Sequence, residues 1–213
     1  LTGGLMRQAE VELDRRRLDH LPADLASGKH RRVDVHIPRT GQHVGGLGRI
    51  QCREPDVGAA HADADLDAGM PSLITSFYGC SGQRCLSGSV LVPVGDVADE
   101  LLEKFSAAAK DMKVGSGLDE KTAMGPVVSA AHKERVLGYI EKGIEEGADL
   151  IMDGRNYISP EFPNGFFISP TIFDNVKPDM TIAKEEIFGP VVSVVRVKNL
   201  DEAIDLINTR GFA

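Results

Sequence analysis

A cysteine that ends a glycine-containing turn is the first feature of this sequence that could do chemistry. Cys85 closes the run from Phe77 (FYGCSGQRC), which follows a short apolar stretch typical of the end of a buried helix. Gly79 and Gly82 allow tight backbone angles and close approach of a ligand. Arg84 places a cation beside the sulfur, and a cation with free backbone N–H groups favours the nucleophilic thiolate. The segment therefore predicts a presented nucleophile, although a small buried cysteine in a glycine turn has the same local appearance.

A second candidate segment lies further along the chain, at Lys184 to Pro190 (KEEIFGP). Glu186 offers two acceptor oxygens, and Phe188 offers an aromatic ring beside a Gly-Pro bend. Taken alone, an exposed glutamate at a helix end and a core phenylalanine are the simpler interpretations of these residues. We interpret Glu185 as facing solvent. The two segments in this order are more specific together than either is alone.

Together, these two segments resemble the aldehyde dehydrogenase superfamily, and most closely its CoA-acylating methylmalonate-semialdehyde dehydrogenase branch. The segments between them carry the same resemblance, namely Met124–Pro126, the longer loop Arg155–Pro163, and Asn164–Ile172. The similarity runs almost without interruption from about Asp63 to Ala213.

The resemblance implies a covalent mechanism with Cys85 as the nucleophile. Its thiolate would attack an aldehyde carbon, its backbone N–H would be one oxyanion donor, and hydride would pass to NAD to leave a thioacyl enzyme. The acyl group would then pass to coenzyme A, with loss of the usual substrate's carboxylate as CO2. Arg84 would bind that carboxylate, for which its guanidinium is suited. Glu186 would bind the ribose of NAD, and Phe188 would pack beside the nicotinamide.

Two other functions stay open on the sequence. One is a non-catalytic remnant or interaction module, because the phosphate-binding strand–loop–helix of the cofactor domain is not recognisable. The other is a cysteine-dependent acyl transferase or esterase that transfers no hydride. The general-base glutamate of hydrolytic family members is not visible at Arg53–Ala60, which fits a CoA-dependent branch and equally a scrambled segment.

Composition and charge restrict the class of partner. A net charge of −8 over 213 residues argues against nucleic acid or an anionic membrane, and no apolar run is long enough for a transmembrane helix. The odd count of cysteines indicates a reducing compartment, so we expect a cytoplasmic protein in which Cys52 and Cys80 are structural. The histidine spacing fits no tetrahedral metal site, so we expect no metal. We expect a small-molecule aldehyde as partner, and the family implies a homo-oligomer.

The chain changes character near residue 70. All eight Phe and three Tyr lie after this position, and five of the six His lie before it. A stretch without aromatic rings has little with which to build a core. We therefore expect residues 1–70 to be a degenerate, frame-disrupted or poorly ordered remnant of the cofactor domain. Residues 71–213 would be a C-terminally truncated catalytic domain.

The sequence of residues 71–213 predicts a three-layer α/β fold with a parallel-type sheet and flanking helices. Strands are expected at 89–94, 148–152, 169–173 and 191–197, and helices at 97–112, 129–146 and 200–208. Asp96 and Asn199 are predicted helix caps, and Gly147 a left-handed helix end. We expect Cys85 near the carboxyl end of the sheet. In residues 1–70, the sequence predicts a helix at 9–25, an edge strand at 32–38 and a strand at 49–52.

Overall fold

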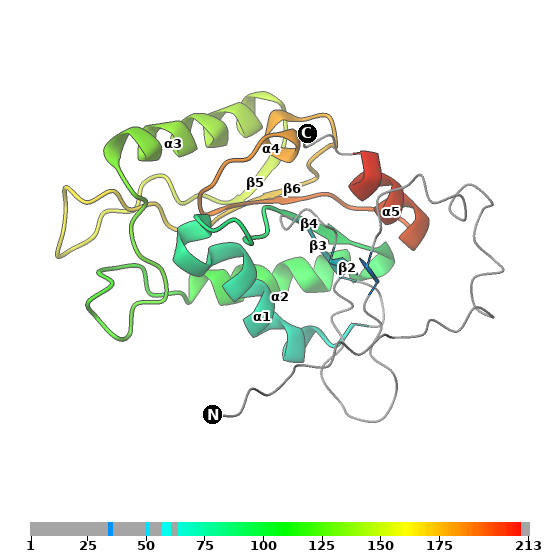
Figure 1. The fold of residues 1–213 in the computed structure, drawn as a ribbon, viewed down its shortest axis with the longest axis horizontal. Coiled ribbons are helices and arrows are strands. Elements are labelled where there is room, and N and C mark those ends of the chain that lie inside the picture. The colour runs from blue at the N-terminus through cyan, green and yellow to red at the C-terminus, as the bar shows by residue number, and fades with distance from the viewer. Residues whose placement is uncertain (1–33, 36–49, 52–56, 61–63, 210–213) are drawn as a thin grey trace, which may run out of the picture. The chain divides into compact units, whose positions relative to one another are not determined.

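The computed structural model describes residues 34–35, 50–51, 57–60 and 64–209 (Figure 1). These residues form a sheet of five strands in the order β3-β4-β7-β6-β5 and a separate antiparallel pair, β1 with β2. The strand bounds are β1 Asp34–Val35, β2 Ile50–Gln51, β3 Val57–Ala60, β4 Val90–Pro93, β5 Asp149–Met152, β6 Thr171–Asp174 and β7 Val191–Val194.

Four strands of the sheet run parallel, and β5 runs antiparallel at one edge. The register pairs Val57 with Val90 and Val90 with Ser193, and Thr171 of β6 with Val191. At the antiparallel edge, Leu150 pairs with Phe173. The predicted parallel-type sheet is therefore confirmed, with one antiparallel edge strand added.

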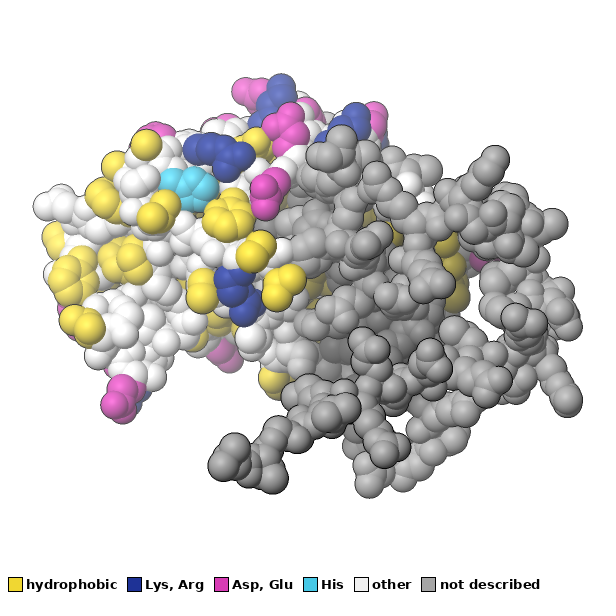
Figure 2. Space-filling model, in the orientation of Figure 1, with side chains coloured by type: hydrophobic (Ala, Val, Ile, Leu, Met, Phe, Trp, Pro, Cys, Tyr) yellow, Lys and Arg dark blue, Asp and Glu magenta, His cyan; other side chains and the backbone are white. Residues whose placement is uncertain are grey.

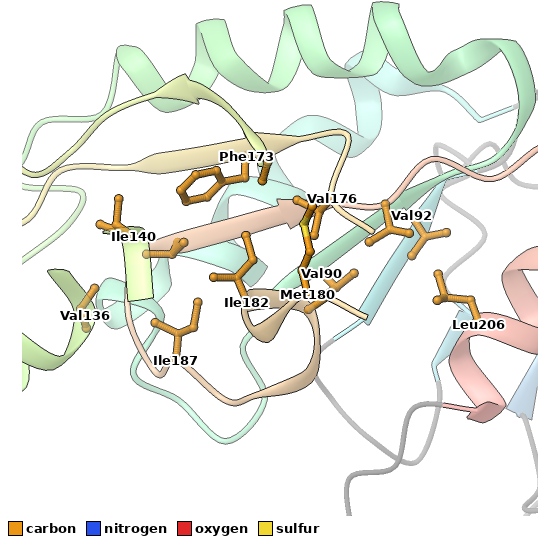
Figure 3. Packing of buried hydrophobic residues seen from close by; sticks show 14 of the residues in the cluster. Val90, Val92, Val136, Ile140, Phe173, Val176, Met180, Ile182, Ile187 and Leu206 are labelled. Atoms are coloured by element: carbon orange, nitrogen blue, oxygen red, sulfur yellow. The ribbon is translucent and has the colours of Figure 1, made fainter. Parts of the chain in front are cut away.

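Helices cover both faces of the sheet, because successive side chains of each strand point to opposite sides. In β4, Val90 and Val92 face the cluster that includes α3 (Ala130–Glu145), α4 (Thr181–Lys184) and α5 (Leu200–Thr209), shown in Figure 3. Leu91 faces the other cluster, which includes α1 (Leu66–Tyr78) and α2 (Ala98–Lys110). Figure 1 shows α1 and α2 on one side of the sheet and α3 and α4 on the other. The three-layer α/β fold is thus confirmed.

The helix ends follow the predicted capping chemistry with one exception. The predicted cap Asn199 accepts from the backbone N–H of Glu202 at 2.9 Å, and Ser129, for which no cap was predicted, accepts from that of His132 at 3.2 Å. Gly147 has φ +87, the left-handed end that was predicted. The Asp96 cap is wrong, because a 3-10 turn at Gly95–Val97 precedes α2 and the helix starts without a side-chain cap.

The structure also adds one strand that the sequence did not predict. β3 lies within a segment that we interpreted as scrambled, yet it pairs in parallel with β4, and Ala60 is fully buried. The strand expected at 49–52 corresponds to β2, and that at 32–38 corresponds to β1. The predicted helix at 9–25 lies outside the described residues. The division of the chain at residue 70 stays a prediction.

The described residues offer neither a candidate metal site nor a helix that could span a membrane. They contain no group of three or more His, Cys, Asp or Glu side chains arranged to hold a metal ion. Nor does any described helix combine the length and apolarity needed to cross a membrane.

Candidate active site

The cysteine turn begins where α1 ends, on a tightly packed aromatic base. Phe77 and Tyr78 are buried at the end of α1, and both rings lie 5.7 Å from the ring of Phe105 in α2. Such aromatic pairs contribute about 0.5–1.5 kcal/mol beyond the area that they bury. Tyr78 also donates its hydroxyl to the Thr171 carbonyl at 3.3 Å. The start of the turn is therefore fixed to both α2 and the sheet.

The turn itself has a left-handed backbone. Cys80, Ser81 and Gly82 have φ values of +53, +58 and +71. The left-handed conformation costs roughly 1–2 kcal/mol for a residue other than glycine. Two hydrogen bonds hold the turn in place, from the Ser81 hydroxyl to the Gly125 carbonyl at 2.6 Å and from the Val128 N–H to the Gln83 side chain at 2.9 Å. A strained, tethered turn of this kind is common at functional sites.

Cys85 is exposed and its thiol is free. The alternative of a small buried cysteine is therefore excluded for this residue. Cys80, which we expected to be structural, is also free and exposed. The turn thus carries two free cysteines in exposed positions. Cys52 lies outside the described residues.

Arg84 turns back toward the end of α1. Its guanidinium donates to the backbone carbonyls of Thr75 and Ser76, the latter at 3.4 Å. It also lies over Gly79, where a Cβ atom would stand 2.9 Å from the guanidinium carbon. A cation is favourable at a helix C-terminus, where the carbonyls carry partial negative charge. The described contacts of Arg84 are therefore structural, and its predicted role toward a substrate carboxylate stays a prediction.

The second predicted segment forms the loop between α4 and β7. Glu186 is exposed on this loop, and Phe188 is half-buried with φ +59. The side chain of Glu185 accepts a hydrogen bond from the Tyr139 hydroxyl at 2.7 Å, so this residue contacts α3 although it is exposed. The loop therefore leaves the carboxylate of Glu186 and part of the Phe188 ring accessible.

The fold brings the two predicted segments into direct contact. A Cβ atom on Gly82 would lie 2.2 Å from the carbonyl oxygen of Gly189 and 3.3 Å from the nitrogen of Pro190. Only a glycine allows this approach of two backbones. The cysteine turn and the Glu186–Phe188 loop are thus neighbours in space.

The position of this contact corrects one prediction. Cys85 was expected near the carboxyl end of the sheet. The turn instead contacts Gly189 and Pro190, which lead into β7, and Tyr78 reaches Thr171 at the start of β6. Cys85 itself lies five residues before Val90, the first residue of β4. The amino ends of these parallel strands lie together, so the site is at the amino end.

Three polar residues that were not predicted as part of the site contact the same loop. His132, Arg135 and Tyr139 of α3 form hydrogen bonds with residues 185–188. Their spacing of three and four places them on one helix face. That spacing was the available signal, but such a polar stripe is also typical of a solvent-facing helix surface.

Comparison with known proteins agrees with this fold and these motifs. The aldehyde dehydrogenase family profile matches residues 58–213. Malonate-semialdehyde dehydrogenase 2 of Geobacillus kaustophilus is 52% identical over 151 residues, which are 71% of this chain and 31% of the relative.

Two solved structures are similar over the same region. The methylmalonate-semialdehyde dehydrogenase of Oceanimonas doudoroffii has a TM-score of 0.70 and 42% identity, over 73% of this chain and 32% of that one. A Sinorhizobium meliloti protein complexed with NAD has a TM-score of 0.69 and 44% identity, over 71% of this chain and 31% of that one. The chain spans about a third of the length of the relatives it matches. By its matched sequence and its fold, the chain belongs to the aldehyde dehydrogenase family.

Proposed function

We propose that this chain supplies the nucleophile-bearing part of an NAD-dependent aldehyde dehydrogenase, with Cys85 as the nucleophile. The observation that carries the proposal is the contact of Gly82 with Gly189 and Pro190. It joins an exposed free thiol to a loop with an exposed carboxylate and a partly exposed aromatic ring. The match to the aldehyde dehydrogenase family supports the same assignment.

The chemistry of the chain's own residues begins at the sulfur. The Cys85 thiolate would form a carbon–sulfur bond with the aldehyde carbon, and the carbonyl electron pair would move to the oxygen. The backbone N–H of Cys85 would donate to that oxygen as the negative charge develops. When the C=O bond re-forms, the C–H bond breaks, and the sulfur keeps the acyl group as a thioester.

The residues of the loop fit a nicotinamide cofactor. Glu186 provides two acceptor oxygens, which suit two neighbouring ribose hydroxyls, and the Phe188 ring provides an apolar surface for a flat heterocycle. Bound NAD would supply the hydride acceptor for the reaction. A relative with 44% identity is known in complex with NAD, which supports the choice of cofactor.

The proposal also extends to the class of aldehyde that the chain acts on. Relatives named as malonate- and methylmalonate-semialdehyde dehydrogenases favour a short semialdehyde with a carboxylate. Beside the turn, Leu86 is 71% exposed and Val128 is 78% exposed. Figure 2 shows further apolar side chains scattered over the described part of this face. Such side chains suit the carbon chain of a small substrate. Coenzyme A would then attack the thioester carbon, and its acyl product would leave Cys85 as a thiol.

The cell compartment and the domain division are further parts of the proposal. The free thiols of Cys80 and Cys85 are consistent with a reducing compartment such as the cytoplasm. Residues 71–213 would provide the catalytic part, and residues 1–70 a degenerate remnant of the cofactor domain.

The decisive experiment mixes the chain with malonate semialdehyde and NAD and records NADH absorbance in the first turnover. A burst stoichiometric with the chain is expected, and coenzyme A should convert it to continuous turnover. Cys85→Ser should abolish the burst, whereas Cys80→Ser, which removes the other exposed thiol of the turn, should keep it. A normal burst in Cys85→Ser would refute the assignment of the nucleophile.

The same variants distinguish a dehydrogenase from the two alternative functions, an acyl transferase or esterase and a non-catalytic remnant. Ester hydrolysis that is lost in Cys85→Ser and indifferent to NAD would select an acyl transferase or esterase. A Cys85 that alkylates readily in a chain showing no NAD-induced thermal shift would select a non-catalytic remnant. Each outcome replaces the dehydrogenase proposal rather than modifying it.

A further inference from the structure

One face of α3 contacts the loop that carries Glu186 and Phe188. His132, Arg135 and Tyr139 lie on this face at helical spacing. Val136, on the same face, packs against Gly189, where a Cβ atom would lie 2.7 Å from the valine Cγ2. The helix therefore approaches the loop through apolar packing at one point and polar contacts around it.

The polar contacts reach three consecutive backbone carbonyls. Arg135 donates from Nη2 to the Glu186 carbonyl at 2.8 Å and from Nη1 to the Ile187 carbonyl at 3.0 Å. His132 Nε2 lies 2.7 Å from the Phe188 carbonyl oxygen. A carbonyl oxygen can only accept, so Nε2 of His132 must carry the proton. Two side chains of one helix thus fix the backbone at three successive residues.

These bonds act where the backbone needs support. Phe188 has φ +59, a conformation that a bulky residue adopts only when its surroundings impose it. Hydrogen bonds from a charged guanidinium are stronger than neutral ones and can outweigh such local strain. The contacts of His132 and Arg135 are therefore the described interactions best placed to hold this conformation.

The hydrogen bonds from α3 go to backbone oxygens and not to the carboxylate of Glu186, while the Phe188 ring meets the His132 ring edge-on with centroids 6.5 Å apart. Arg135 and His132 bind backbone oxygens, while the Glu186 side chain stays exposed and the Phe188 side chain half-exposed. A helix that needed only to neutralise Glu186 would bind its carboxylate instead. The carboxylate of Glu186 and the exposed part of the Phe188 ring therefore remain available to a ligand while the backbone is held.

We propose that Arg135 and His132 are positioning residues that hold the backbone of Glu186–Phe188 in the conformation that binds NAD. The inference rests on the proposed function for its ligand, but the loop conformation can be measured without a ligand. Tyr139 supports Arg135, whose guanidinium carbon lies 5.1 Å from the centre of the tyrosine ring. Burial and the Glu185 hydrogen bond raise the pKa of Tyr139, which keeps its hydroxyl protonated as a donor.

The test compares disruptive and conservative variants of both residues. Arg135→Met and His132→Leu remove the donors, whereas Arg135→Lys and His132→Gln each keep one. Lys142→Met is the matched control, because it removes a cation from an exposed ion pair with Glu145 on the same helix. Each variant is measured for melting temperature, for the backbone NMR shifts and coupling of Phe188, which report its φ, and for NAD affinity by titration.

Arg135→Met and His132→Leu should lose the positive-φ signature of Phe188 and weaken NAD binding about tenfold, because the binding conformation of the loop becomes less populated. The conservative variants should recover most of the affinity, and Lys142→Met should match the parent. A merely structural role would lower the melting temperature without this split between variants.

The inference is overturned if Arg135→Met and His132→Leu keep both the Phe188 signature and the parental NAD affinity. A parent chain that binds no NAD would instead overturn the cofactor part of the proposed function. The Phe188 signature would still decide whether the two side chains position the loop. The two failures are therefore distinguishable.

Discussion

Gly82 and Gly189 meet backbone to backbone, with the position of a Gly82 Cβ only 2.2 Å from the Gly189 carbonyl oxygen. One residue belongs to the turn that presents Cys85, and the other ends the loop that carries Glu186 and Phe188. No side chain separates the two segments at this point. The distance between the thiol and the loop is therefore set by backbone packing.

Gly82→Ala should damage this contact in two ways. Its φ of +71 disfavours alanine, at a cost of about 1–3 kcal/mol, and the added methyl group must also displace the Gly189 backbone. We expect a lower free energy of unfolding in urea and a loss of the NADH burst. Gly138→Ala is the control, because this exposed position in α3 has no atom within 4 Å of its Cβ. It should be stabilising by about 0.5–1 kcal/mol. Equal stability of the two variants would contradict the importance of the contact.

Arg84 can be tested for its structural and substrate roles separately. Arg84→Met removes the hydrogen bonds to the Thr75 and Ser76 carbonyls and should destabilise the chain by about 1–3 kcal/mol. If Arg84 also binds a substrate carboxylate, the variant should lose more activity with malonate semialdehyde than with propanal. An equal loss with both aldehydes would leave the α1 contact as its whole role. Chemical denaturation and steady-state rates provide the two measurements.

Arg196 is expected to matter for stability rather than chemistry. Its guanidinium binds both carboxylate oxygens of Asp174, which is only 4% exposed, and also contacts Asp99 of α2. Arg196→Met should cost about 3–5 kcal/mol, because it leaves a buried carboxylate without a partner. The double variant Arg196→Met/Asp174→Asn should recover part of that loss. Urea denaturation of the single and double variants measures the effect, and a double variant no more stable than the single one would count against it.

Stability should fall in acid, partly through Glu146. Hydrogen bonds from the side chain and backbone N–H of Thr181 hold the pKa of Glu146 below its ordinary value of 4.5. A carboxylate whose folded pKa is depressed stabilises the fold above its unfolded pKa, and this stability is lost as the pH falls through the folded pKa. The Glu146 contribution should therefore disappear progressively below about pH 4.5.

Glu146→Gln provides the check. This variant should be less stable than the parent at pH 7, and the difference should shrink as the pH approaches 3. Thermal melts across this range measure it, with Glu134→Gln, an exposed position on α3, as a control for lost charge. A difference that is constant with pH would show that Glu146 does not titrate with folding.

Local patterns in the sequence were sufficient for much of the fold. Val90, Leu91 and Val92 are all buried on alternate faces of a strand that is covered on both sides, and such a continuous apolar run can be recognised without a partner strand. Gly147 and Asn199 could be assigned as helix ends, because capping depends on residues close in sequence. The antiparallel direction of β5 could not be predicted, since pairing between strands is not a local property.

The sequence by itself determined the family and located the two segments that carry Cys85 and Glu186, because residue types and short spacings carry that information. Only the tertiary structure decided that Gly82 touches Gly189, that Arg84 turns toward the end of α1, and that Arg135 holds the loop before Phe188. The tertiary structure also showed that Cys85 lies near the amino ends of the strands and not near the carboxyl ends, where it was predicted. These relationships join segments far apart in the chain, and they form only when the sheet and its two helical layers pack together.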